Sequence, residues 1–447
     1  MASIVARGKR FSVVYKVNGE QKWESFKTRA EAESRKKEIE YKHDIGTFVP
    51  PNPMTVEDFL KEYVEVYGLT KWGHSAYKSN NGLIRNYVNP IIGSWKLKDL
   101  TTKRMDRYFA NLKDQPAVQQ TGRGDPGFIS DRNIHDINQL LSNAFDKAVE
   151  WEYVGKNPVT HNACPSRENR PREIWDPDTA KKALTLCDEL NLLVCMHLSI
   201  PCSLRIGEIV GLRWALVSLG DDENGFEDAT LKVDVQLQRI SKDVYEKLKR
   251  KQDQIKLIFP GFKETSKSML VLKKLKTKNS ERVMWIPATT AAILWKLKKQ
   301  QEELKSLIGD EYQDFDMVIA QTNGRPIEGG SIDEMFAKFI EANKLPKVEF
   351  HSLRHLSTTV KLLISKGDIK TVQGATGHSQ AKMVTDTYAH ILDKNRQSIA
   401  KKFEQSFYGN DEGDGTPELS VEQLIAMCAK NPDALETLRN LLTAKTV

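Results

Sequence analysis

His351-Ser-Leu-Arg354-His355 is the stretch on which the fold assignment of this chain depends. A lone His-x-x-Arg pattern occurs by chance in many helices, so its meaning depends on the segments around it. Four other short segments accompany it in order: Ser203-Leu-Arg205-Ile-Gly-Glu208, Lys276-Thr-Lys278-Asn-Ser-Glu-Arg282, Gly377-His378-Ser379 and Thr385-Asp-Thr-Tyr388. Together they supply guanidinium, ammonium, imidazole and phenol groups, a combination that suggests phosphodiester chemistry.

In these segments the chain resembles the tyrosine recombinase family, which comprises phage and mobile-element integrases and Xer-type resolvases. The family pattern has an Arg on a helix, a Lys on a β-hairpin, His-x-x-Arg, a His or Trp, and a Tyr. The ten-residue step from His378 to Tyr388 matches the family, as does the order of all six groups. The resemblance implies the following site residues: Arg205, Lys276, His351, Arg354, His378 and Tyr388.

The chemistry of DNA strand transfer explains these residue types. Arg205 and Arg354 can bind the non-bridging oxygens of a phosphodiester through bidentate hydrogen bonds, and they stay charged at any working pH. Tyr388 would be the nucleophile, and His351 would help to remove its proton. Lys276 would protonate the leaving 5′-oxygen, and His378 would hydrogen-bond the phosphate. Because the 3′-phosphotyrosine stores the energy of the broken bond, we expect no ATP, no metal ion and no other cofactor.

Some neighbouring residues compete for these roles. Lys274 and Lys278 flank Lys276, which the Lys-Thr step of the family favours. The position along the motif favours His351 over His355, which we expect to be a packing or supporting group. Glu208 is expected to be a buried partner that orients an arginine.

The first 48 residues predict a small β-hairpin and helix module. Phe11, Val13, Tyr15 and Val17 alternate as in a half-buried strand, and Asn18-Gly19 is a strong hairpin signal. Thr28-x-x-Glu31 predicts a capping box at the start of a helix. The module carries eleven Lys and Arg residues against seven acids, so its sheet could contact a DNA groove, although a plain structural cap competes with this interpretation.

Three further regions follow a proline-rich linker that ends at Pro53. Apolar residues at helical spacing predict an all-α domain over 54–158, opened by a cap at Thr55. A mixed, mainly helical domain is expected over 175–408, and an acidic linker with a helical tail over 409–447. The predicted fold class is therefore multidomain α+β, with a catalytic domain of the tyrosine recombinase type.

The segment 239–278 departs from a compact family member, because it holds thirteen Lys and Arg residues against four acids. It is interpreted as an insertion before the lysine hairpin, with a helical pattern from Asp243 to Lys256. Contacts with DNA phosphates and a merely solvated, charged surface are the two interpretations of this segment.

The resemblance also implies partners. Double-stranded DNA would be bound at core sites by 54–158 and 175–408 and at arm sites by 1–48. Four protomers would assemble on two duplexes, with the tail docking on its own or a neighbouring protomer. DNA-bending or excision proteins are possible accessories. A type IB topoisomerase and a catalytically silent DNA-binding regulator are the alternatives.

Composition agrees with a DNA-binding protein that has no membrane partner. The net charge is +7, although residues 409–447 hold only three Lys or Arg residues against seven acids. No apolar run approaches the ~18 residues that a membrane span needs. The five cysteines form no CxxC pair, which predicts reduced thiols and a cytoplasmic, nucleoid-associated protein.

Overall fold

The computed structural model describes residues 2–17, 20–44, 53–118, 127–159, 164, 173–220, 225–261, 265–275, 280–365 and 367–376. These residues belong to one unit, Met1–Ser379. The predicted tail at 409–447 lies outside the described residues, and so does most of the linker at 159–174.

The N-terminal residues form the expected sheet and helix. Strands β1 (Ser3–Arg7), β2 (Arg10–Val17) and β3 (Glu20–Phe26) pair antiparallel in that order, and α1 (Arg29–Asp44) follows. Val13 and Tyr15 are buried with residues of α1, as expected. Ser12 and Val14 are buried too, so the predicted half-buried alternation is wrong for this part of β2. The Thr28 N–H donates to the Glu31 carboxylate and the Glu31 N–H to the Thr28 hydroxyl, so the capping box is confirmed.

The described residues of the predicted all-α domain, 54–118 and 127–158, are mainly helical, as predicted. The elements are α2 (Val56–Tyr63), η1 (Val64–Gly68), α3 (Leu69–Lys71), α4 (His74–Leu83), η2 (Ile84–Val88), α5 (Asn89–Ile92), η3 (Leu97–Asp99), α6 (Thr102–Leu112) and α7 (Asp131–Glu150). The Thr55 hydroxyl accepts from the Asp58 N–H, which confirms the predicted cap. The core gathers Phe59, Phe109 and Phe145, all fully buried. The segments η1 and η2 are π-helical turns, which the sequence pattern did not indicate.

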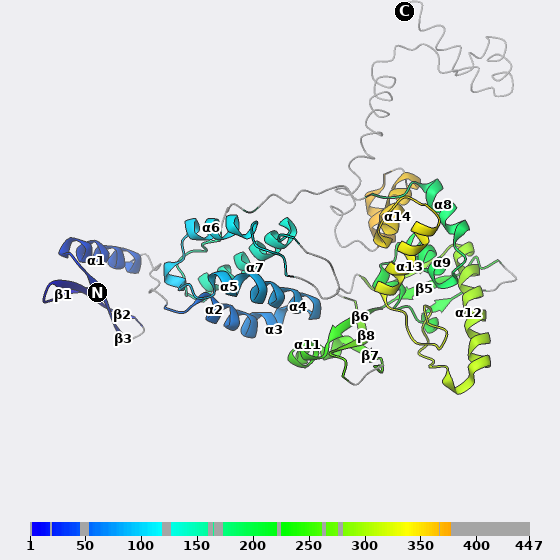
Figure 1. Cartoon of the computed structure of the whole chain (residues 1–447), viewed down its shortest axis with the longest axis horizontal. Coiled ribbons are helices and arrows are strands. Elements are labelled where there is room, and N and C mark those ends of the chain that lie inside the picture. Colours follow the sequence, from blue (N-terminus) through cyan, green and yellow to red (C-terminus); the bar gives the residue numbers. More distant parts are fainter. Residues whose placement is uncertain are drawn as a thin grey trace, which may run out of the picture. The chain divides into compact units, whose positions relative to one another are not determined.

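The third region is built around the apolar helix α9. Its first helices are α8 (Pro177–Leu186), α9 (Leu190–Ser199) and α10 (Ile206–Ile209). The later ones are α12 (Ala288–Ile308), α13 (Gly329–Ala342), α14 (Phe350–Ile364) and α15 (Ile369–Thr376). Helices α12, α13 and α14 each contact α9, and Figure 1 shows α9, α13 and α14 close together. This core therefore fixes α14 and the end of α9 next to each other.

Two three-stranded sheets complete this region. One has the order β4-β5-β9, formed by β4 (Val217–Ser218), β5 (Thr230–Val233) and β9 (Arg282–Trp285). The other has the order β6-β8-β7, formed by β6 (Val235–Ser241), β8 (Ser268–Lys274) and β7 (Ile255–Ile258). Residues 229–237 have the apolar pattern of a single strand, but the structure divides them between β5 and β6, because the chain leaves one sheet at Asp234 and enters the other. Periodicity cannot reveal such a break when both halves are apolar.

Candidate active site and nucleic-acid interface

Arg205 stands at the start of a short helix and is held there by a carboxylate. It is the N-cap of α10, and Glu208 accepts hydrogen bonds from its backbone N–H (3.2 Å) and from its Nη1 (2.8 Å). The Glu208 side chain is 2% exposed and that of Arg205 is 38% exposed. The prediction that Glu208 is a buried partner of an arginine is confirmed, and the Arg205 side chain stays accessible to an anion.

Glu208 also binds a second arginine. The Nη2 of Arg282, on β9, donates over 2.9 Å to Oε2 of Glu208, the oxygen that also accepts from the Arg205 backbone N–H. Burial alone would raise the pKa of Glu208, but the charges and hydrogen bonds of Arg282 and Arg205 hold that pKa below its usual value. The carboxylate is therefore ionised at neutral pH, and it links α10 to the strand that follows the predicted lysine hairpin.

Arg354 is almost completely buried, with 2% of its surface exposed. Its Nη1 donates to the carbonyl oxygen of Ser203, and its Nη2 donates to the carbonyl oxygen of Thr376 over 2.7 Å. Ser203 precedes Arg205 by two residues, and Thr376 precedes His378 by two residues. One guanidinium on α14 therefore ties together the backbone segments that lead to two other predicted site residues.

The two histidines of the motif lie on the same helix as Arg354. His351 and His355 are one turn apart on α14 and are both half-buried. Their rings meet edge to face, with centroids 4.9 Å apart. His355 therefore packs directly on His351, which fits the supporting role expected for it.

Three of the six predicted site residues, Lys276, His378 and Tyr388, lie outside the described residues. Of the competing lysines, Lys274 ends β8 opposite Val235, and Lys278 is also outside the described residues. The structure places Arg205 at the start of α10 and both Arg354 and His351 on α14. The catalytic roles of all six residues stay predictions.

Sequence reasoning missed two groups behind Arg354. Ser203 is fully buried with a backbone φ of 57°, and its hydroxyl accepts a hydrogen bond from the Lys361 ammonium over 2.8 Å. Lys361 lies seven residues after Arg354 on the same helix, a spacing of two turns that places both on one face. This spacing was the available signal, but a lysine in a helix is usually interpreted as a surface residue.

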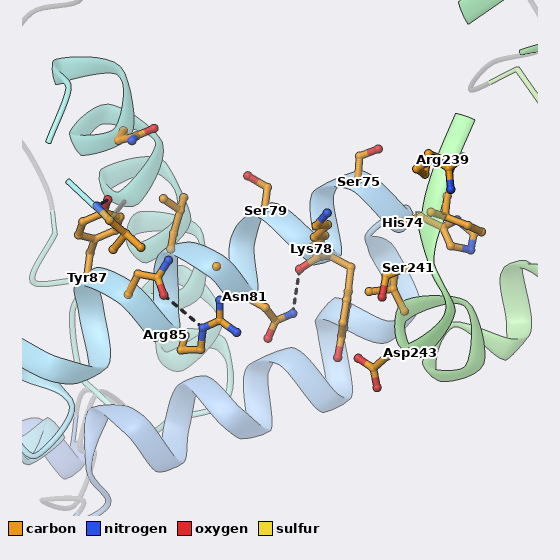
Figure 2. Close-up of a pocket in the computed structure, with 18 of the residues that line it drawn as sticks. His74, Ser75, Lys78, Ser79, Asn81, Arg85, Tyr87, Arg239, Ser241 and Asp243 are labelled. Atoms are coloured by element: carbon orange, nitrogen blue, oxygen red, sulfur yellow. Dashed lines mark hydrogen bonds between the residues drawn. The ribbon is translucent and has the colours of Figure 1, made fainter. Parts of the chain in front are cut away.

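A groove with a volume of about 1420 Å³ runs along α4 in the helical region. Figure 2 shows Ser75 and Ser79 pointing away from α4 in a similar direction, with Arg239 and Ser241 on the facing segment. Its other polar lining residues include Lys78, Asn81, Arg85, Ser130, Asn133 and Lys247. Short hydroxyl and amide groups between cations are the side chains that contact phosphates in DNA complexes.

His74 closes one end of this groove without a polar partner. It is 2% exposed, and neither ring nitrogen has a hydrogen-bond partner among the described residues. Burial lowers the pKa of His74 to about 4, and the nearby charges of Lys273 and Lys251 act in the same direction. The ring is therefore neutral at physiological pH.

The basic insertion is part of both hydrophobic cores. Its first half forms α11 (Lys242–Lys247) and η5 (Lys249–Gln254), so the expected helix is shorter than predicted, and β7 begins at Ile255. Val244 and Leu248 are buried in the core of the helical region, whereas Phe259 is buried in the core around α9.

Several cations of the insertion bind protein groups. Arg239 pairs with Glu328, Lys247 pairs with Asp243, and the Lys251 ammonium donates to the Trp72 carbonyl over 2.7 Å. Three others, Lys249, Lys256 and Lys267, are exposed. The predicted phosphate contacts of the insertion therefore remain a hypothesis about these three.

The described residues contain no group of His, Cys, Asp or Glu side chains suited to holding a metal ion. Within the same ranges, every helix is too short or too polar to cross a bilayer. The four described cysteines, Cys164, Cys187, Cys195 and Cys202, are all free, as predicted.

Two family models match the chain. "Phage integrase family" matches residues 175–395, and "Phage integrase, N-terminal SAM-like domain" matches residues 55–112. The first match spans the elements that carry Arg205 and Arg354, and the second covers α2 to α6.

Curated relatives and a solved structure point the same way. The chain is 24% identical over 392 residues to "Tyrosine recombinase XerC-like" of Caldanaerobacter subterraneus subsp. tengcongensis, which covers 85% of this chain and 90% of that protein. It is 24% identical over 320 residues to the ICEBs1 integrase of Bacillus subtilis, covering 71% and 75%. The fold is similar to that of the Tn1549 transposon integrase in complex with circular intermediate DNA, with a TM-score of 0.58, 17% identity, and coverage of 78% and 99%.

Proposed function

The chain belongs to the phage integrase family of tyrosine recombinases, which cut and transfer DNA strands, and from this premise we propose which of its residues perform the reaction. The phenolic oxygen of Tyr388 attacks a DNA phosphorus atom and forms a 3′-phosphotyrosyl bond. The bond from phosphorus to the 5′-oxygen breaks, and Lys276 gives that oxygen a proton. Attack by another 5′-hydroxyl reverses these steps on a new strand and restores Tyr388.

The arginines and histidines have separate parts in this proposal. Arg205 and Arg354 bind the non-bridging oxygens and stabilise the charge that builds up in the transition state. His351 takes the proton of Tyr388, and His378 hydrogen-bonds the phosphate. No step requires a metal ion, ATP or another cofactor.

One observation carries this assignment. The Arg354 guanidinium is hydrogen-bonded to the carbonyl oxygens of Ser203 and Thr376, each two residues before another proposed site residue. A side chain placed in this way supports a shared phosphate site for Arg205, Arg354 and His378, because the segments that carry them are anchored to one group.

A nicked suicide duplex tests the chemistry. Its cut releases a short fragment, so that the covalent complex accumulates and is seen as a shifted band on a denaturing gel. Wild-type protein should form the adduct without added metal or ATP, and Tyr388→Phe should form none. Tyr312→Phe, a half-buried tyrosine remote in sequence from the motifs, is the matched control and should react like wild type. An adduct with Tyr388→Phe would overturn the assignment.

The DNA surfaces are a second part of the proposal. Residues 54–158 would bind core DNA through the groove along α4, where Lys78 and Arg85 are exposed. Residues 1–48 would bind arm sites through the sheet face that carries Arg7 and Trp23. The guanidinium carbon of Arg7 lies over the Trp23 ring, 4.5 Å from its centroid. Removal of 1–48 should abolish arm-site footprints and leave cleavage of a core-site duplex intact.

The assembly is proposed from the family and from the tail. Four protomers would act on two duplexes, with residues 409–447 docking on the same or a neighbouring protomer and with DNA-bending or excision proteins as accessories. Mass photometry with a synthetic four-way junction should give a tetramer for the full chain. A chain ended at residue 408 should show a smaller tetramer fraction if the tail docks in trans.

A further inference from the structure

A lysine lies behind the two arginines of the proposed site. The Lys361 ammonium donates to the Ser203 hydroxyl over 2.8 Å, and that hydroxyl also lies 2.5 Å from the hydroxyl of Ser357. Ser203 and Ser357 are buried, with 0% and 2% of their surfaces exposed. The three side chains form a polar cluster between α14 and the turn that precedes Arg205.

Ser203 has a backbone conformation that needs support. Its φ of 57° lies in the left-handed region, which residues with a Cβ seldom adopt and which persists only where the surroundings hold it. The Ser203 carbonyl oxygen accepts the hydrogen bond of the Arg354 guanidinium, and Arg205 follows two residues later. The backbone conformation of Ser203 therefore determines where its carbonyl oxygen accepts from Arg354, and also the direction in which the chain enters the turn that carries Arg205.

We propose that Lys361 is a positioning residue of the phosphate site, which holds Ser203 in its left-handed conformation and thereby orients both Arg205 and Arg354. This inference rests on the proposed function and extends it to a residue that does not touch the DNA. It also gives a reason for a lysine in a place where its charge is costly to bury.

The charges around Lys361 agree with such a role. Burial lowers the pKa of Lys361 to about 8. The positive charges of Arg354 and Arg282 also lower this pKa, whereas Cys202 raises it. Burial also raises the pKa of the Cys202 thiol to about 12, so the thiol is neutral and provides no counter-charge at neutral pH. The buried carboxylate of Glu208 is bound to Arg205 and Arg282.

The experiment compares adduct formation by variants at Lys361 and Ser203. Lys361→Met removes the ammonium, and we expect its rate of adduct formation on the nicked duplex to fall about tenfold, with the affinity for intact DNA within twofold of wild type. Ser203→Gly removes the Cβ that disfavours positive φ. The double variant Ser203→Gly with Lys361→Met should therefore recover to within about threefold of Ser203→Gly alone. Lys338→Met, an exposed lysine of α13, is the matched control.

A pH profile separates positioning from simple stabilisation. At low DNA concentration the rate reports groups of the free protein. The wild-type rate should fall as the pH rises through about 8, because Lys361 loses its charge there. The rate of Lys361→Met should not show this fall. Thermal unfolding of every variant is measured alongside, and Lys361→Gln, which keeps a donor of similar length without the charge, replaces Lys361→Met if the latter does not fold.

The outcomes are distinct. A wild-type rate for the Lys361 variant, or no recovery in the double variant despite wild-type unfolding temperatures, overturns the role of Lys361. In either case the proposed function stands, provided that wild type forms the adduct and Tyr388→Phe does not. If wild type forms no adduct at all, the proposed function itself fails.

Discussion

The guanidinium of Arg354 links helix α14 to helix α15 by donating a hydrogen bond to the carbonyl oxygen of Thr376 over 2.7 Å. Thr376 is the last described residue of α15 and is fully buried. Arg354 is thus a structural residue as well as a proposed catalytic one.

Replacing Arg354 by lysine should damage both roles. A single ammonium cannot reproduce the planar fork that binds two carbonyl groups on different segments. We expect adduct formation to fall by about 100-fold or more, the usual cost of losing one transition-state donor. The unfolding temperature should also fall by several degrees. A variant that lost activity with unchanged stability would show that the two carbonyl contacts are dispensable for the fold.

Glu208→Ala should destabilise the protein more than Glu208→Gln. The alanine leaves Arg205 and Arg282 side by side without a counter-charge, at a cost of about 3 kcal/mol. The glutamine still has an oxygen and should cost about 1–2 kcal/mol. Denaturant unfolding at neutral pH measures both. Equal effects would mean that the carboxylate charge contributes little in this site.

Charge reversal in the groove along α4 should weaken DNA binding in a salt-dependent way. Lys78→Glu and Arg85→Glu should each lower affinity for a core-site duplex and reduce the slope of log affinity against log salt by about 1. Lys181→Glu, on the exposed side of α8, is the control. An unchanged slope in both groove variants would exclude phosphate contacts there.

The buried ring of His74 predicts an acid-sensitive contribution to stability. Its pKa is about 4 in the folded protein and near 6.5 in the unfolded chain, so only the unfolded chain takes up a proton between these values. Stability should therefore fall as the pH drops from about 6.5 to 4 and stay level above. The free energy of unfolding of His74→Phe should not show this fall between pH 6.5 and 4. The difference in unfolding free energy between the two proteins at pH 7 to 8 gives the effect of the substitution that does not depend on pH. Parallel curves from pH 7 to 4 would contradict the prediction.

The insertion should contribute to the stability of the helical region. Leu248 is 1% exposed in the core of that region, so Leu248→Ala should cost about 2–4 kcal/mol. Lys249→Ala, the exposed neighbour, should cost little. Limited proteolysis within 54–158 provides the readout, because local opening exposes cleavage sites. Equal protection in both variants would show that α11 does not support this core.

Sequence patterns predicted the parts that depend on local rules. The caps at Thr28 and Thr55, the hairpin strands around Tyr15 and the pairing of Glu208 with Arg205 all follow from residue types at fixed spacing. They are local because each partner lies within a few residues of the other or on the adjoining strand.

What the sequence could not provide depends on distant partners. Nothing near Arg354 in the chain indicates that its guanidinium turns inward to Ser203, because the two are far apart in sequence. The seven-residue spacing places Lys361 on the same helix face as Arg354, but its role is recognisable only once the left-handed conformation of Ser203 is known. The switch between sheets at Asp234 likewise depends on distant strands, because β5 pairs with β9 and β6 pairs with β8. The alternation of apolar residues along one strand does not indicate which strand it pairs with.

The anchoring of Leu248 and Phe259 in two different cores has a consequence for recombinase engineering. A chimera that exchanges only residues 243–264 with another integrase would leave vacancies in both cores at once. Grafts intended to redirect target choice should instead take the donor's α4 and its inserted segment as a matched pair, because each supplies side chains that the other covers.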